Sequence, residues 1–505
     1  MRFMVQRIST VTECAVSGKI NGTSDRKNTF ILSVRCKEIS MTQEEKFNKM
    51  TTEPVPKLVG TLAVPTIISM LVSSFYNMAD TFFVGKLNTS ATAAVGVVFS
   101  LMAIIQAFGF LFGHGAGNFM ARKLGEKNRE EASQIANAGF FFCLVFGIIL
   151  MTLGLIFVEP LAYFLGSTDT ILPYAVDYMR IILWGSPYMM ASFVLNNQMR
   201  YQGNAMYAMV GILVGAVLNI ALDPLLIFGL DMGIKGAAWA TIISQLVSFL
   251  LLLGATRFGG NIPITLKRNP FVFRLLPEIC LGGLPSLCRQ GIASISVILL
   301  NTSARDLAFA HAGGTDAILY ADAAIAGMSI VSRITMFANS ALIGFGQGFQ
   351  PVCSFNYGAK IYKRVKESFW FCVKTSFIFL IVVAVLGFIF APGLVQLMRD
   401  DDALVSQIGS FALRAQCITF PLNAWIVMCN MLLQACGQSF SASLVASCRQ
   451  GICFIPMLYI LPALFDFTGL MIAQPVADVF TLVISMGFGL YFLRKLQDTS
   501  ITGGE

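Results

Sequence analysis

Charged side chains are scarce in this sequence. Asp, Glu, Lys and Arg make up only 12% of the 505 residues, against roughly 25% in a typical soluble domain. Hydrophobic residues reach 56%, and the mean hydropathy is +0.72. So few charges cannot cover a surface that faces water, and most of the exterior must therefore face lipid. This composition excludes a soluble enzyme, a nucleic-acid-binding protein and a disordered chain.

Metal ligands and catalytic motifs are scarce as well. The sequence has two His and twelve Cys; it contains no CxxC pair, and ten of the Cys lie in apolar segments, where an isolated Cys behaves as a small hydrophobic residue. HExxH, GxSxG and Walker lysine motifs are absent too, and these are common signatures of hydrolases and ATPases. We therefore expect no enzymatic activity, no catalytic residue, no metal centre and no cofactor.

The amino-terminal region differs from the rest of the chain. Residues 1–40 are polar, lack periodicity and contain no apolar run long enough for a secretory signal. We expect residues 1–49 to be a disordered tail or the product of an upstream start codon, with translation beginning at Met41 or Met50.

Twelve apolar segments follow, each long enough to cross a bilayer core, which takes about 20 residues of helix. The sequence thus predicts an all-α membrane protein with spans near residues 60–84, 92–117, 135–158, 173–200, 205–229, 234–256, 276–303, 322–349, 368–396, 405–434, 440–464 and 468–493.

The connections between these segments alternate in positive charge. One set carries fifteen Lys and Arg, Arg200 among them, whereas the other set carries four, namely Lys86, Lys235, Arg305 and Arg399. Positively charged loops stay in the cytoplasm. We therefore expect a multi-pass protein of the bacterial inner membrane with both termini in the cytoplasm, which requires an even number of spans.

The two halves of the chain repeat each other. GHGAGNFMARKLGEKNREEA at 113–132 matches GQGFQPVCSFNYGAKIYKRV at 346–365 with an offset of 233, and 186–205 matches 420–439 with an offset of 234. Pro65 in AVPTI matches Pro285 in GLPSL with an offset of 220. The shorter offset places an insertion in the outer loop near 306–320.

This repeat predicts two six-helix lobes that point the same way across the membrane. Their expected bounds are 50–260 and 276–495, with a cytoplasmic linker at 261–275 and a short tail at 496–505. Paired bundles of this kind are typical of secondary transporters, whose substrate site lies between the bundles near the middle of the membrane.

Ionisable residues inside a span cost at least ~2.5–3.5 kcal/mol at its centre, so each needs a partner or a function. Asp80 in the first segment and Asp223 in the fifth lie at similar depth, because both are about five or six residues from the outer end. Asn219 precedes Asp223 by one helical turn, and Thr241 reaches a comparable level. We predict that this group binds a proton or a cation; the alternative is that each Asp only bonds a neighbouring helix. Pro65 removes a backbone hydrogen bond and lets the first helix bend, as a switch or as a static kink.

The second half has no acid at the matching positions. It carries Arg289, Arg333 and Arg449 within spans, and Asp478 in the last one. We expect Arg–Asp or Arg–carbonyl pairing among them; the alternative is that these residues and Gln290 are polar residues of a cavity that faces a ligand. Asn196 recurs as Asn430, which favours a packing role for both.

Four separated motifs resemble the multidrug and toxic compound extrusion (MATE) transporters, in particular the MepA-like members near the DinF branch. They are MADTFFVGKLNTSATAAVG, LNIALDPLLIFGLDMGIKGAAWATIISQ, GLPSLCRQGIASIS and MFANSALIGFGQGFQPVCSFNYGAK, within a likeness that covers about residues 50–495.

This resemblance implies a V-shaped pair of lobes and a monomeric antiporter that exports amphipathic, often cationic drugs in exchange for H⁺, or for Na⁺, while embedded in membrane lipids and without a nucleic-acid partner. It further implies that the coupling site consists of Asp80, Asn219, Asp223, Asn196 and Thr241, and that Pro65 is the proline that bends the first helix. NorM-type relatives use a Glu in the seventh helix, where this sequence has Ala293.

Three other functions remain open from the sequence. The arginines of the second half suit a flippase for lipid-linked oligosaccharides of the same superfamily. ARKLGEKNRE faintly resembles a loop of major-facilitator transporters, although LNIALDP argues against that family. A membrane scaffold or sensor that transports nothing would keep the same fold.

Overall fold

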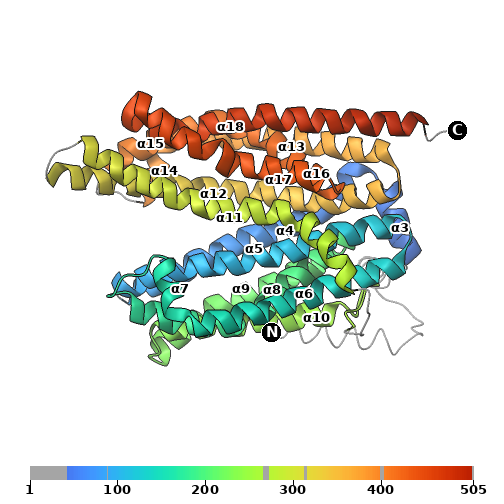
Figure 1. Ribbon diagram of the computed structural model, residues 1–505, viewed down its shortest axis with the longest axis horizontal. Coiled ribbons are helices and arrows are strands. Elements are labelled where there is room, and N and C mark those ends of the chain that lie inside the picture. Colours follow the sequence, from blue (N-terminus) through green and yellow to red (C-terminus); the bar gives the residue numbers. More distant parts are fainter. Residues whose placement is uncertain (1–42, 88, 266–271, 312–314, 399–402, 503–505) are drawn as a thin grey trace, which may run out of the picture.

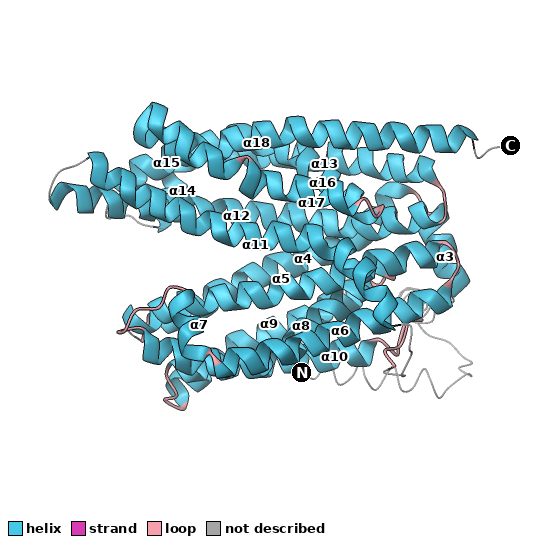
Figure 2. Ribbon diagram, viewed as in Figure 1, coloured by secondary structure: helices cyan, strands magenta, loops and turns pink. Residues whose placement is uncertain are grey.

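The computed structural model describes residues 43–87, 89–265, 272–311, 315–398 and 403–502. These residues form helices and short turns, with no strand among them (Figure 2). Most of the expected amino-terminal tail lies outside the described residues.

The described residues of the first half of the chain form six long helices and two short ones. Their bounds are α3 (Gln43–Thr52), α4 (Val55–Gly85), α5 (Thr89–Gly125), α6 (Arg129–Ile156), α7 (Val158–Phe164), α8 (Leu172–Tyr201), α9 (Ala205–Pro224) with a π-helical turn η1 (Leu225–Gly229), and α10 (Ile234–Ala255).

The second half repeats this pattern with more interruptions. Its elements are α11 (Val272–His311), α12 (Thr315–Gly358), α13 (Tyr362–Ile389), α14 (Ala391–Met398), α15 (Ala403–Thr419), η2 (Phe420–Leu422), α16 (Asn423–Ala435), α17 (Ser439–Ser447), η3 (Cys448–Ile452) and α18 (Phe454–Thr502).

Ten stretches of the described chain are long and apolar enough to span a membrane. The last of them, Ser439–Leu496, is two spans, because Phe465 and Asp466 leave the helical conformation inside α18. With the 30-residue α8, which is less apolar, the count reaches the predicted twelve. Many large apolar side chains on the outer faces are exposed, such as Ile378 and Val483, as a lipid-facing surface requires.

The two halves form two lobes that together make a V (Figure 1). They converge at the end that carries α3 and the carboxyl terminus, which we call the closed end, and they diverge toward α7 and α14, which we call the open end (Figure 1). Helices α4 and α5 of the amino lobe pack against α11 and α12 of the carboxy lobe.

The sequence repeat is also a repeat of backbone conformation. Residues with positive φ recur at the same offsets: Lys127 at 61° and Lys360 at 60°, and Gly203 at 82° and Gly437 at 78°. Gly233 at φ 55° and ψ −134° matches Asp466 at φ 52° and ψ −136°. Equivalent turns therefore end equivalent helices in both lobes.

The lobes meet through glycines that are themselves repeat partners. A Cβ atom at Gly125 of α5 would overlap the carbonyl oxygen of Phe355, and one at Gly358 of α12 would overlap that of Arg122. Backbone therefore touches backbone where the two helices cross at the closed end, and only glycine allows this approach. This contact places the pseudo-two-fold axis between Gly125 and Gly358.

Two expectations need correction. The predicted outer-loop insertion near 306–320 is mostly helical, because α11 extends to His311 and α12 begins at Thr315. Residues 43–49 are not part of a disordered tail, since they belong to α3.

Helix α3 is held against the closed end by contacts with both lobes. The Phe47 ring lies 5.5 Å from that of Phe355, and Lys127 Nζ lies 4.6 Å from the centre of the Phe47 ring. Asn356 donates to the Met50 carbonyl at 3.1 Å. Lys46 is 9% exposed, and its ammonium has no hydrogen-bond partner.

Gly233→Ala should destabilise the fold by about 1–3 kcal/mol, because no non-glycine residue adopts its backbone conformation without strain. Gly254→Ala, at the other end of α10, is the matched control, since neither glycine has an atom within 4 Å of its added Cβ. A thiol-reactive dye can report thermal unfolding, because the described cysteines are buried or half-buried. Equal melting temperatures for the two variants would contradict the strain at Gly233.

Docking of α3 should strengthen as the pH rises above about 8. Burial, and then repulsion by Arg129 and Lys49, lowers the pKa of Lys46 from 10.5 to about 8, so the docked helix favours the neutral amine between these two values. Lys46→Met should therefore slow chymotrypsin cleavage after Phe47 at neutral pH and remove the pH dependence. Asn48→Met, on the exposed side of α3, should do neither; cleavage that is equally slow in both variants would refute the effect of charge.

Candidate functional site

Asp80 and Asp223 are brought together inside the amino lobe. Asp223 is fully buried in the last turn of α9, and it experiences the charge of Asp80 on α4. Asn219, one turn earlier on α9, donates Nδ2 to Asp223 Oδ1 at 3.2 Å. Three other oxygen atoms are buried without a hydrogen-bond partner: Asp80 Oδ1, Asn219 Oδ1 and Asp223 Oδ2. An acceptor-rich group of this kind is suited to hold a cation.

Tyr178 completes this group, and sequence reasoning missed it. Its side chain is 1% exposed and interacts electrostatically with Asp80, Thr241, Asp223 and Tyr76. Its hydroxyl nevertheless makes no hydrogen bond of acceptable geometry. The depth argument that paired the two aspartates would also have found Tyr178, because it lies about six residues from the open end of α8.

A polar cavity lies next to these residues. Its volume is about 70 Å³, which is enough for a few water molecules or an ion but far below the roughly 300 Å³ of a drug pocket. Its polar lining residues are Ser73, Tyr76, Gln106, Ser192, Asn196, Asn219, Thr241, Ser244, Gln245 and Ser248. All of them belong to the amino lobe, so the cavity, like the two aspartates beside it, lies within that lobe.

Asn196 has a packing role, as its repetition suggested. Its Nδ2 donates to the Ala208 carbonyl at 2.9 Å, and Asn430 donates to the Ala442 carbonyl at 2.6 Å. The two bonds are related by the repeat. Because Asn196 also lines the cavity, its carbonyl oxygen is the part of the side chain left for a cation.

Pro65 lies inside α4, which runs without interruption from Val55 to Gly85. Fifteen residues separate Pro65 from Asp80, a distance of about 22 Å along the helix axis. Pro65 therefore belongs to the half of α4 nearer the closed end, away from the carboxylate group.

The polar residues of the carboxy lobe occupy different environments. Arg449 pairs with Asp478 at 3.2 Å, which confirms the expected Arg–Asp pairing, and Asn423 and Gln474 also donate to Asp478. Arg333 is exposed on α12. Arg449, Asp478 and Arg333 therefore do not form one cluster with Arg289.

Arg289 and Gln290 lie at the interface between the lobes. Arg289 Nη1 donates to Asn430 Oδ1 at 3.3 Å, and Gln290 Nε2 donates to Gln106 Oε1 of the amino lobe at 3.1 Å. The predicted set of carboxy-lobe residues is thus divided between a structural ion pair, an exposed arginine and this interface.

Hydrogen bonds between the lobes continue toward the closed end. Arg200 of α8 donates to Gln347 of α12, and the Tyr201 hydroxyl donates to Gln350 at 3.0 Å. Ser354 donates to Asn118 Oδ1 at 2.8 Å. The charge pattern assigned Arg200 to a loop, but it is 3% exposed; only packing between the lobes reveals its place.

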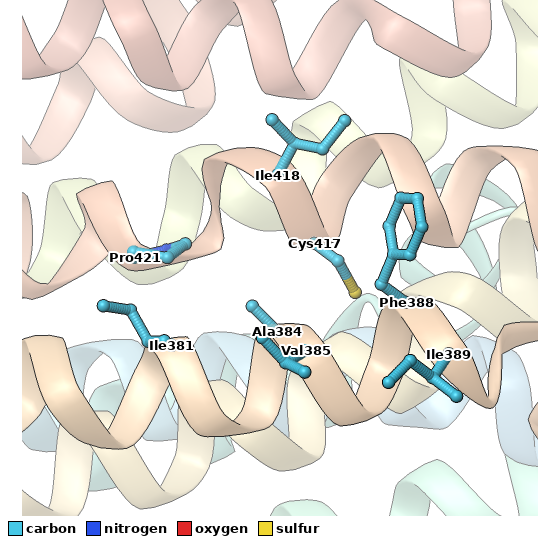
Figure 3. A pocket seen from close by; sticks show the side chains of 8 residues that line it. All are labelled: Ile381, Ala384, Val385, Phe388, Ile389, Cys417, Ile418 and Pro421. Carbon is cyan, nitrogen blue, oxygen red and sulfur yellow. The ribbon is translucent and has the colours of Figure 1, made fainter.

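The larger cavity, of about 290 Å³, is a groove between α13 and the end of α15. All eight side chains that line it are apolar, including Val385, Phe388 and Ile418 (Figure 3). A groove without a polar group cannot orient a ligand or hold an ion, so it is not the functional site.

A sequence model of the MatE family matches residues 65–225 and 317–460, which together make up more than half of the chain. The chain belongs to the MatE family. This excludes a major-facilitator transporter, and it confirms the resemblance carried by the four motifs.

Relatives of this MatE protein include the multidrug export protein MepA of two staphylococci. The protein of Staphylococcus aureus (strain MRSA252) is 27% identical over 454 residues, which cover 90% of this chain and 97% of the relative. That of Staphylococcus haemolyticus (strain JCSC1435) is 26% identical and covers 86% of this chain and 92% of the relative.

Solved structures share the fold. One is the outward-facing conformation of a multidrug resistance MATE family transporter of the MOP superfamily, with a TM-score of 0.82 at 24% identity over 90% of this chain and 99% of the other. Another is a MOP superfamily transporter from Pyrococcus furiosus, with a TM-score of 0.81 at 24% identity over 91% and 99% of the chains; a binding pocket of reverse polarity suggested a different function for it. The predicted pair of six-helix lobes in a V is confirmed.

Proposed function

We propose that this MatE protein is a secondary antiporter that exports amphipathic, often cationic drugs in exchange for H⁺ or Na⁺. The observation that carries this proposal is the group of buried oxygens of Asp80, Asn219 and Asp223 that lack hydrogen-bond partners. Relatives named multidrug export proteins, which match along almost their whole length, support the substrate class. They favour an exporter over the flippase of lipid-linked oligosaccharides.

The carboxylates of Asp80 and Asp223 act together as a charge store, by which we mean a site whose negative charge is neutralised when an ion binds. Two acids that share a region of low dielectric repel each other, and uptake of one H⁺ or Na⁺ relieves this repulsion. One proton that enters across ~100 mV supplies ~2.3 kcal/mol, enough for a gradient of roughly 40- to 50-fold of a substrate without net charge. One-for-one exchange with a monovalent cation moves no net charge, so the concentration gradient of the coupling ion drives that exchange. Coupling requires that the ion and the drug weaken each other's binding, and this effect is reciprocal.

The positive-inside rule places the closed end in the cytoplasm, together with both termini, of a bacterial inner membrane. The described conformation is then open to the outside. Export requires the closed end to separate as well, and this breaks the inter-lobe bonds of Arg200, Tyr201 and Ser354. A single chain contains both lobes and the ion site, so a monomer suffices, with lipid around it and no cofactor.

Asp80→Asn and Asp223→Asn should each abolish uphill transport. A fluorescent cationic drug is measured in proteoliposomes, with a pH gradient and a Na⁺ gradient imposed separately, and the gradient that drives wild-type transport identifies the coupling ion. Each variant loses one carboxylate of the charge store but keeps its size, so accumulation should fall to the passive level.

Asp177→Asn is the matched control, because this half-buried residue of α8 forms an ion pair with Lys235, whose side chain is exposed; its transport should equal that of the wild type. Full accumulation by both site variants would exclude the coupling role of Asp80 and Asp223.

A further inference from the structure

Two arginines at the interface between the lobes have no opposite charge beside them among the described residues. The hydrogen bonds of Arg200 go to Gln347 and, at 2.5 Å, to Asn197 Oδ1, and its Nε has no partner. Arg289 reaches Asn430 Oδ1 at 3.3 Å. In the part of the chain that the structure describes, the acceptors of both guanidinium groups are therefore neutral amide oxygens.

His114 of α5 lies within electrostatic reach of both arginines. Its side chain is 1% exposed, and neither ring nitrogen has a hydrogen-bond partner. The centre of its ring lies 6.3 Å from that of Tyr201, the neighbour of Arg200 in sequence, and both His114 and Tyr201 interact electrostatically with Arg200 and Arg289. Side chains from α5, α8 and α11 thus bring two positive charges and an unsatisfied imidazole together between the lobes.

The internal repeat shows that the fold does not need these charges. The position that corresponds to Arg200 in the carboxy lobe is Gln434, which accepts from Gln350 at 2.9 Å and donates to the Gly282 carbonyl and Ser286 Oγ. The position that corresponds to Arg289 in the amino lobe is Ser69, which bonds the Pro65 carbonyl at 2.8 Å. At each of these two positions, the other half of the chain thus has a neutral side chain that makes hydrogen bonds within the protein.

A buried guanidinium without a counter-charge is costly, and the loss is recovered when an anion binds. Arg449 avoids this cost through its ion pair with Asp478. Arg200 and Arg289 have no such pair, and guanidinium groups are well matched to the planar fork of a carboxylate or to phosphate oxygens.

We propose that Arg200 and Arg289, together with His114, form a subsite that binds the acidic group of a transported amphiphile. The inference rests on the proposed export function and deepens it, because it names the residues that would hold an acidic group of the substrate. Since Arg200 is bonded to Gln347 across the lobes, the subsite becomes accessible when the closed end separates, which is the state that loads a substrate for export.

The subsite is adjacent to the ion site of the amino lobe. Gln106 lines the polar cavity there, and its Oε1 accepts from Gln290, the neighbour of Arg289 in sequence. One hydrogen bond therefore links the lining of the polar cavity to the residue next to Arg289.

The test compares two dyes that differ only in one acidic group, a cationic rhodamine methyl ester and the corresponding free acid. Binding to the purified protein and transport in proteoliposomes are both measured. Arg289→Gln and Arg200→Gln should each reduce the ratio of free-acid affinity to ester affinity by about tenfold or more. Arg200→Gln installs the residue that the carboxy lobe already uses at this position, and Arg289→Lys should keep part of the affinity.

Arg414→Gln is the control for the loss of one positive charge, because Arg414 is exposed and, among the described residues, contacts Phe388 of its own lobe. Equal binding of the free acid by the wild type and Arg289→Gln would overturn the subsite. So would strong binding of inorganic phosphate at the arginines without arginine-dependent binding of the free acid, since it would show a small-ion site only.

Failure of the proposed function gives a different result. The wild type could bind the free acid in an arginine-dependent manner and yet move neither dye against a gradient. That result would support the subsite and contradict the proposed antiport. If Asp80→Asn stops transport of both dyes while Arg289→Gln stops only that of the free acid, both proposals are supported.

Discussion

The structure is governed by the cost of an ionised side chain in a medium of low dielectric. Such a group needs an opposite charge or a ligand that supplies one. Arg449 and Asp478 satisfy this need within the carboxy lobe, where Asn423 and Gln474 occupy the remaining lone pairs of the carboxylate. Asp80 and Asp223 do not, and their unpaired oxygens lie beside a small polar cavity. The positive charges of Arg200 and Arg289 are likewise unmatched, at the interface between the lobes.

Comparison of the two repeats distinguishes the residues that the fold requires from those that serve function. The crossing at Gly125 and Gly358, the paired turns at Gly203 and Gly437, and the amide bonds of Asn196 and Asn430 occur in both lobes and hold the helices in place. The unmatched charges are not repeated: Gln434 takes the place of Arg200 in the carboxy lobe, and Ser69 takes the place of Arg289 in the amino lobe. Pro456 stands where the repeat would place a partner of Asp223. A duplicated scaffold thus carries unduplicated charges, and this asymmetry lets ion binding act on one lobe alone.

Much of this arrangement could be predicted from the sequence. Apolar segments give the spans, and counting residues from their ends gives depth, so Asp80, Asn219 and Asp223 were expected at one level, where they meet. Depth does not say which way a side chain faces, and for this reason Arg333 was grouped with Arg289. Tyr178 lies at the depth of the aspartates and was missed because the depth argument was applied only to the two acids, Asn219 and Thr241. The burial of Arg200 and the docking of α3 depend on packing between distant helices, which no local pattern encodes. The helical extension of α11 and α12 was missed because an offset change gives the length of an insertion but not its conformation.

The most direct measurement is the affinity of the purified protein for a cationic drug across a series of pH values and Na⁺ concentrations. The account predicts that affinity falls as the coupling ion increases, because the ion fills the charge store of the amino lobe and the two ligands weaken each other. An affinity that stays constant in the wild type across both series would contradict it.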